Sequence, residues 1–183
     1  MRIIIGITGA SGTIYALRLI DYLNEDKYLI ITENAKKIML YENGVDYLTL
    51  KDKVKKIYND NDLFAPVSSG STRFDAFIVI PASMNTVAKF ANGIADTLIT
   101  RVFSVSLKEK RKIIIIPRET PLNSINIENM KKLSDLGVVV MPACPGFYFN
   151  PKSIDDLVNF IVFRILDQLG IEGDYPRWEK NTF

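Results

Sequence analysis

Small and polar residues that could bind a phosphate follow an apolar run at the start of the chain. Residues 2–8 are rich in β-branched side chains, Gly9–Gly12 interrupts them, and residues 13–23 have helical periodicity. This pattern predicts a strand, a tight turn and a helix whose N-terminal N–H groups can bind an anion. The glycines do not match the G-x-G-x-x-G spacing of dinucleotide-binding turns, so the kind of phosphate stays open. A helix capped by Ser11 without any ligand is the less favoured alternative.

Polar or charged residues also follow the later apolar runs of strand length. Parallel strands place their carboxyl ends at one edge of a sheet, and ligands bind at that edge in open α/β folds. We therefore expect these loops to lie close to the first turn. They are Thr32 at the end of residues 28–32, Ser83–Thr86 after 75–80, Arg118–Glu119 after 113–116, and residues 142–151 after 138–141.

The sequence contains no histidine. This excludes Ser-His-Asp and Cys-His nucleophile systems and metal sites built on histidine. Acid–base chemistry must therefore be performed by Glu, Asp, Lys, Tyr or Ser, or by the substrate. The one cysteine, Cys144, cannot form a disulfide within the chain, which predicts a reducing, cytoplasmic location.

Composition limits the class of protein further. The 183 residues are 48% hydrophobic, which is sufficient for the core of a single domain. The net charge is only +2, which argues against a dedicated nucleic-acid-binding protein. No apolar run approaches the roughly 18 residues of a membrane-spanning helix.

Strand-like and helix-like segments alternate along the chain. This predicts an α/β fold with a single doubly wound, mostly parallel sheet of five to six strands and helices on both faces, as in Rossmann-like and flavodoxin-like proteins. We expect one domain over residues 1–183 and a short, lysine-rich helix over residues 48–57. Residues 170–183 form a tail whose Tyr175 and Trp178 predict packing on a neighbouring subunit.

Six short motifs, in this order and across nearly the whole chain, resemble the flavin prenyltransferases, the UbiX-like proteins of the flavoprotein superfamily. The motifs are Gly9-Ala10-Ser11-Gly12, Ser69-Gly70-Ser71, Leu107-Lys108-Glu109-x-Arg111, Arg118-Glu119-Thr120-Pro121, Phe147-Tyr148-x-x-Pro151 and Arg164-x-Leu166-Asp167.

The resemblance implies a reaction and an assembly. UbiX-like proteins transfer a dimethylallyl group from dimethylallyl monophosphate to N5 and C6 of reduced FMN, without a metal. The product, prenylated FMN, serves UbiD-type decarboxylases. The resemblance also implies a flavodoxin-like fold and trimer-based homo-oligomers, up to a dodecamer.

The resemblance implies roles for individual residues as well. The cations and the phenol would neutralise a phosphate as its C–O bond breaks. Glu42 would also contact the substrate and would come from a neighbouring subunit. The implied catalytic residues are Ser11, Glu119, Lys108 and Tyr148; the prenyl phosphate would lie among Lys108, Arg118, Tyr148 and Arg164; and FMN would contact Gly9, Ala10, Ser11, Thr32, Ser83, Met84, Asn85, Thr86 and Arg101.

The second flavin loop departs from the family pattern, which often reads Pro-Cys-Ser-x-Lys-Thr. Residues 81–86 and 91–96 are more similar to flavin-dependent cysteine decarboxylases, so oxidative decarboxylation of a cysteinyl substrate is the alternative. Those enzymes use a catalytic histidine and a Pro-x-Met-Asn motif, and the loop at 142–151 lacks that motif. A non-catalytic flavin store would not need Lys108, Glu119 and the other donor residues together. Prenyl transfer is therefore favoured.

Overall fold

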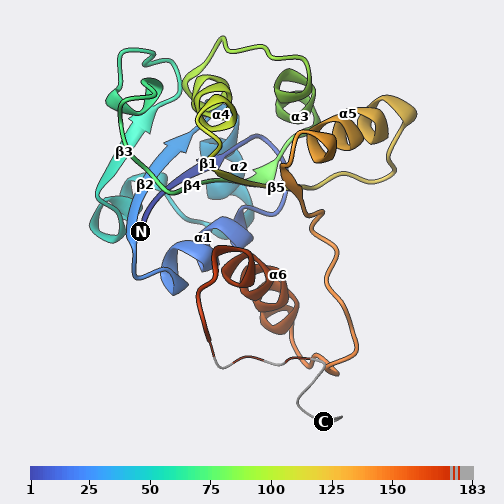
Figure 1. Ribbon diagram of the computed structural model, residues 1–183. Helices are drawn as coiled ribbons and strands as arrows, with labels where there is room; N and C mark the ends of the chain where they lie inside the picture. Colours follow the sequence, from blue (N-terminus) through green and yellow to red (C-terminus); the bar gives the residue numbers. More distant parts are fainter. Residues whose placement is uncertain (174, 176, 178–183) are drawn as a thin grey trace.

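The computed structural model describes residues 1–173, 175 and 177 (Figure 1). Within this part of the chain, six strands form one sheet in which every neighbouring pair is parallel. The order β3-β2-β1-β4-β5-β6 is that of dinucleotide-binding folds, and it reverses direction between β1 and β4. The strands are β1 (Arg2–Ile7), β2 (Asp26–Ile31), β3 (Lys56–Asn59), β4 (Ala76–Ala82), β5 (Lys112–Pro117) and β6 (Val139–Val140).

Helices cover both faces of this sheet, as Figure 1 shows. One buried cluster joins one sheet face to α1, α2 and α6, and a second joins the opposite face to α3, α4 and α5. The doubly wound architecture expected from the sequence is therefore confirmed. The helices are α1 (Thr13–Tyr22), α2 (Glu33–Asn43), α3 (Met84–Ala91), α4 (Leu98–Lys108), α5 (Ser124–Asp135) and α6 (Ile154–Leu169), with short 3-10 helices at Tyr47–Lys53 and Pro66–Ser68.

The central strands supply both clusters with alternating side chains. In β1, Ile3 and Ile5 belong to the cluster under α1, whereas Ile4 belongs to the opposite one. All three are fully buried. Each buried isoleucine contributes roughly 1.5–3 kcal/mol relative to an exposed one. Because both faces are covered, these strands appear in the sequence as continuous apolar runs.

The prediction of a short helix over residues 48–57 is wrong. Its first part is a 3-10 helix, and its second part begins β3 at the edge of the sheet. The backbone N–H of Lys55 donates to Lys27 O at 2.8 Å, and Tyr58 pairs with Ile30. Tyr58 is buried, and its ring stacks on Tyr28 with centroids 6.5 Å apart. Pairing with β2 and burial of one aromatic ring outweigh the helical tendency of the lysine-rich sequence.

Capping residues define several helix ends. Gly44 adopts the left-handed conformation after α2, with φ at 65°. Thr97 caps α4 in a reciprocal arrangement with Thr100, and Ser153 caps α6, where its hydroxyl accepts from Asp156 N. Gly44 thus ends α2, and Thr97 and Ser153 fix where α4 and α6 begin.

The described part of the tail packs on its own chain. The ring of Tyr175 stacks on Phe163 of α6 with centroids 4.4 Å apart, and its hydroxyl donates to Asp167. Trp178 lies outside the described residues. Packing of residues 170–183 on a neighbouring subunit stays a prediction. Among the described helices, none is both long and apolar enough to cross a membrane.

Candidate active site

The first turn is shaped by a glycine in a left-handed conformation. Gly12 caps α1 with φ at 101°, and no side chain caps this helix from the Gly12 position. A Cβ at Gly12 would also lie 3.1 Å from the ring of Tyr15. Any other residue would therefore be strained here. The exposed Ser11 precedes it and does not cap the helix, so the alternative of a Ser-capped helix is wrong.

The carboxylate of Glu42 occupies the N-terminus of α1. Its Oε2 accepts from Gly12 N at 3.0 Å, from Thr13 N at 3.2 Å and from Thr13 Oγ1 at 3.1 Å. Burial by itself raises the pKa of Glu42, but hydrogen bonds from Ser11, Gly12 and Thr13 outweigh it and lower that pKa below its usual value. The N–H groups expected to bind a phosphate thus bind a carboxylate of the same chain. Within one chain, Glu42 already lies against the first turn.

A buried threonine joins the first turn to the loop after β4. The Oγ1 of Thr8 donates to Pro81 O at 2.8 Å and accepts from Ser83 N at 2.8 Å. The backbone N–H of Thr8 also donates to Pro81 O, at 3.2 Å. Thr8 is only 1% exposed. Thr8 is not among the site residues expected from the sequence. Its position at the end of an apolar strand, directly before a glycine turn, was the available signal.

The loop after β4 starts α3 next to the first turn. The Oγ of Ser83 accepts from Thr86 N at 3.3 Å and lies 3.0 Å from Thr86 Oγ1. The backbone N–H groups of Met84 and Asn85 have no hydrogen-bond partner within the described chain. Such N–H groups at a helix N-terminus are suited to a phosphate. Thr32 similarly caps α2, and its N–H bonds Ile7 O at 3.1 Å.

The loop after β5 completes this edge of the sheet. The Nε of Arg118 donates to Ser11 O at 3.2 Å, and the backbone N–H of Arg118 donates to Ala82 O at 3.3 Å. Glu119 is exposed, and its Oε1 accepts from Thr120 N at 3.1 Å. The loops after β1, β4 and β5 therefore lie side by side, as the sequence predicted.

Lys108 does not lie at this edge within one chain. It ends α4 just before β5 begins, whereas Arg118 follows the end of β5. A six-residue strand is about 20 Å long, so the two cations lie at opposite edges of the sheet. Lys108 pairs with Glu109 instead. Arg101, nearer the start of α4, donates from Nε to Ser68 O at 3.1 Å.

Arg164 and Tyr148 are also held away from the first turn. Arg164 pairs with Asp167 at 2.8 Å in the second half of α6, close to where Lys112 at the start of β5 bonds Gln168 O. Tyr148 lies in the loop between β6 and α6, which extends away from the sheet in Figure 1. Its half-exposed ring contacts Phe160 edge to face. One chain therefore does not bring together the four residues expected around the prenyl phosphate.

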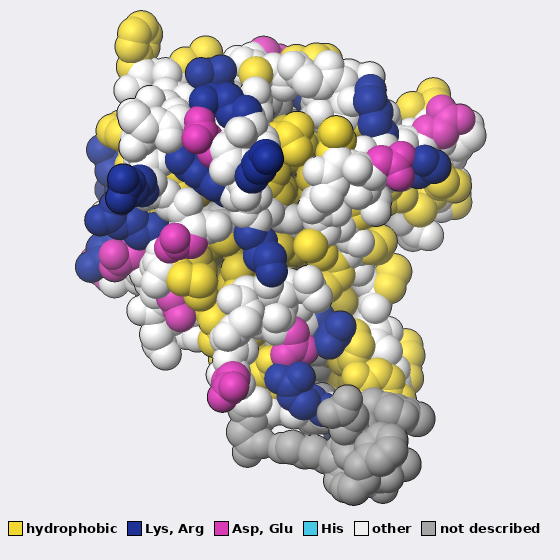
Figure 2. Space-filling model, viewed as in Figure 1, with side chains coloured by type: hydrophobic (Ala, Val, Ile, Leu, Met, Phe, Trp, Pro, Cys, Tyr) yellow, Lys and Arg dark blue, Asp and Glu magenta, His cyan; other side chains and the backbone are white. Residues whose placement is uncertain are grey.

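Hydrophobic side chains are exposed on α5 and beside the loop that carries Tyr148. Figure 2 shows them near α5 and along the loop that precedes α6. Ile125 and Ile127 of α5 are 65% and 54% exposed, and Phe147 and Ile154 beside the loop are 69% and 74% exposed. An exposed apolar surface of this kind is typical of contacts with other chains.

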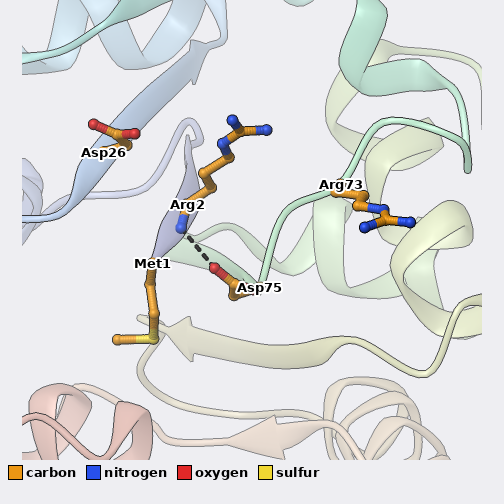
Figure 3. A pocket seen from close by; sticks show the side chains of 5 residues that line it. All are labelled: Met1, Arg2, Asp26, Arg73 and Asp75. Carbon is orange, nitrogen blue, oxygen red and sulfur yellow. Dashed lines mark hydrogen bonds between the residues drawn. The ribbon is translucent and has the colours of Figure 1, made fainter.

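A hollow at the opposite, amino edge of the sheet has mixed charge. It measures about 470 Å³ and is lined by Met1, Arg2, Asp26, Arg73 and Asp75 (Figure 3). The backbone N–H of Arg2 donates to Asp75 at 2.7 Å. Two carboxylates beside two guanidinium groups make this hollow unsuited to a phosphate. Among the described residues, no cluster of acidic and cysteine side chains could hold a metal ion.

Comparison with known proteins assigns the family. The sequence profile of the Flavoprotein family matches residues 1–166. The flavin prenyltransferase UbiX of Thermoplasma acidophilum is 49% identical over 97% of this chain and 100% of its own length. The chain belongs to the flavin prenyltransferases of the flavoprotein family.

Solved structures confirm the fold at high similarity. The dodecameric FMN-dependent UbiX-like decarboxylase from Escherichia coli O157:H7 superposes with a TM-score of 0.94 and 39% identity, over 98% of this chain and 100% of that one. AnUbiX (PadA1), solved with FMN and dimethylallyl pyrophosphate, gives a TM-score of 0.93 and 37% identity, over 97% of this chain and 96% of that one. The flavodoxin-like or Rossmann-like fold expected from the sequence is therefore confirmed.

Proposed function

We propose that this chain transfers a dimethylallyl group from a dimethylallyl phosphate to N5 and C6 of reduced FMN. The observation that carries the proposal is the meeting of three strand-end loops, in which Ser83 bonds Thr8 and Arg118 bonds Ser11. High identity to a flavin prenyltransferase over nearly the whole chain supports it. The relative solved with FMN and dimethylallyl pyrophosphate supports the same choice of ligands.

The proposed flavin site uses groups suited to FMN. The unpartnered N–H groups of Met84 and Asn85 would bind its phosphate at the start of α3. The remaining contacts would come from the loops after β1, β2 and β4 and from Arg101. When bound, reduced FMN supplies the nucleophilic N5 and C6 atoms. The proposed FMN contacts are Gly9, Ala10, Ser11, Thr32, Ser83, Met84, Asn85, Thr86 and Arg101.

The proposed donor site is shared between copies of the chain. Lys108, Tyr148 and Arg164 lie away from Arg118 within one chain, so other copies would have to supply some of these side chains. A dodecameric relative of 39% identity supports such an assembly. Cations from two or more copies would surround the phosphate and neutralise its charge as it leaves the dimethylallyl group.

Glu119 and Ser11 would transfer protons at the flavin edge, the edge of the sheet where the loops after β1, β4 and β5 meet. Glu119 is exposed at the end of β5, with Arg118 beside it in sequence. Glu42 accepts from Gly12 N and Thr13 N directly after Ser11, and its carboxylate would orient the Ser11 hydroxyl. In this proposal Glu42 acts from the same chain as Ser11, rather than from a neighbour. Glu119 would exchange protons with the substrate during ring closure.

We further propose that the prenylated FMN is passed to a UbiD-type decarboxylase. The donor is a dimethylallyl monophosphate or pyrophosphate, because three cations can accommodate either. Residues 1–183 would form one flavoprotein domain, with the tail from residue 170 packed on a neighbouring subunit.

The test is a prenylation assay under anaerobic conditions. Reduced FMN and dimethylallyl monophosphate are incubated with the protein, and the flavin is analysed by mass spectrometry. We expect a flavin that is heavier by one prenyl unit. Recovery of unmodified FMN alone, together with decarboxylation of a cysteinyl peptide, would instead support the alternative reaction.

A further inference from the structure

A short turn rests directly on the Lys108 side chain. The turn is Ser69–Ser71, between the second 3-10 helix and β4, and it lies against the end of α4. A Cβ built on Gly70 would lie 2.7 Å from Lys108 Nζ and 2.5 Å from Glu109 Oε1. Only a residue without a side chain leaves this space to the two charged groups. The backbone of Gly70 therefore limits where the Lys108–Glu109 ion pair can lie.

Arg111 holds the same turn through a hydrogen bond to its central residue. Its Nη2 donates to Gly70 O at 2.8 Å, and its guanidinium carbon lies 3.9 Å from the centroid of the Phe74 ring. Arg101 adds a second bond to the segment, at Ser68 O. Within the turn, the hydroxyls of Ser69 and Ser71 are 2.9 Å apart. The turn is thus held at several points, and Arg111 holds its central residue.

A buried N–H group without a partner indicates that Arg111 adds little to the free energy of unfolding. Its Nη1 is buried and has no hydrogen-bond partner among the described residues. An unpaired buried donor of a charged group is unfavourable. Replacement of such a group by an apolar side chain of similar length is often neutral for stability. The Arg111→Met side chain would still pack on the Phe74 ring, but it would lose the bond to Gly70 O and the cation–π attraction to that ring.

We infer that Arg111 and Gly70 are positioning residues for the Lys108 ammonium group. Arg111 holds the turn, the turn defines the space beside the ion pair, and Glu109 pairs with the ammonium within that space. This inference rests on the proposed function, in which Lys108 contacts the prenyl phosphate. A displacement of about 1 Å in such a contact can reduce turnover by up to roughly a hundredfold.

Two variants test the inference through different atoms. Arg111→Met removes the side-chain bond that holds the turn. Gly70→Ala adds a methyl group that displaces the ends of the Lys108 and Glu109 side chains. The backbone of Gly70 lies outside the left-handed region, so alanine causes no backbone strain there. Both variants should unfold at the wild-type temperature and bind FMN with wild-type affinity. Both should raise the KM for dimethylallyl monophosphate about tenfold or more. Arg111→Lys, which can still donate to Gly70 O, should recover part of the loss.

A matched control and a measurement independent of activity separate the outcomes. Arg73→Met removes another arginine close to the same turn, one with no hydrogen bond to it, and should leave the KM unchanged. Amide hydrogen exchange at residues 69–72 should accelerate in Arg111→Met and stay unchanged in Arg73→Met. If the wild-type protein makes no prenylated FMN, the proposed function is wrong. The exchange rates would then still show whether Arg111 stabilises the turn. Unchanged exchange in Arg111→Met, or an unchanged KM in both variants of an active enzyme, would overturn the inference.

Discussion

Replacement of Thr8 by valine tests how the flavin edge is held together. Valine has nearly the same shape but lacks the hydroxyl that bridges Pro81 O and Ser83 N. Pro81 O keeps its bond from the backbone N–H of residue 8, so the main loss falls on Ser83 N–H. The loop after β4 would then no longer be tied to the first turn.

The magnitude follows from these contacts. A backbone donor left without a partner costs about 1–3 kcal/mol, so we expect Thr8→Val to lower the free energy of unfolding by about 2 kcal/mol. For a domain of this size, that lowers the melting temperature by roughly 4–8 °C. Thr8→Ser keeps the hydroxyl and loses one buried methyl group, which costs only about 0.8 kcal/mol.

Urea unfolding and flavin titration of both variants provide the measurement. Thr8→Val should be less stable than Thr8→Ser and should bind FMN more weakly, because Ser83–Thr86 is displaced relative to Ser11. Thr8→Ser should bind FMN as the wild type does. Equal stability and equal FMN affinity in the two variants would refute the bridging role of the Thr8 hydroxyl.

Two further changes address the charged groups at this edge. Because the folded state lowers the pKa of Glu42, its charge adds stability that is complete above the ordinary value of 4.5 and is lost as the pH falls through the lower folded pKa. The stability difference between wild type and Glu42→Gln should therefore shrink in that acidic range, and a difference independent of pH would contradict this. Glu119→Gln should keep FMN affinity but slow prenylation by roughly a hundredfold or more, measured in single-turnover experiments. Unchanged turnover would remove Glu119 from proton transfer.

Much of the fold could be predicted because its central strands are buried on both faces. Residues 113–116 are four consecutive isoleucines, which only a covered parallel strand accommodates easily. The strand β3 could not be predicted in the same way. It is four residues long, lies at the edge of the sheet and buries only Tyr58 among lysines. These residues form a strand because they pair with β2, and the local sequence does not reveal that pairing.

The candidate site could be predicted only in part, for a related reason. The loops after β1, β4 and β5 were predictable because the order of parallel strands alone puts their ends at one edge. The bridge made by Thr8 was not, because its partners lie 73 and 75 positions away. The motifs also predict that Lys108 and Arg164 contribute to the donor site, but they do not indicate which copy of the chain would supply them. That information requires the position of the end of α4 relative to β5.

The most direct test of the account is prenyl transfer by mixed oligomers. Lys108→Ala and Glu119→Gln are purified separately, unfolded, mixed and refolded together, and the prenylated FMN is quantified by mass spectrometry. We predict that wild type makes the product, that each variant alone makes little, and that the mixture recovers activity, because Lys108 of one copy serves the flavin edge of another. Absence of prenylated FMN from the wild type, or a mixture no more active than the two variants apart, would contradict the account.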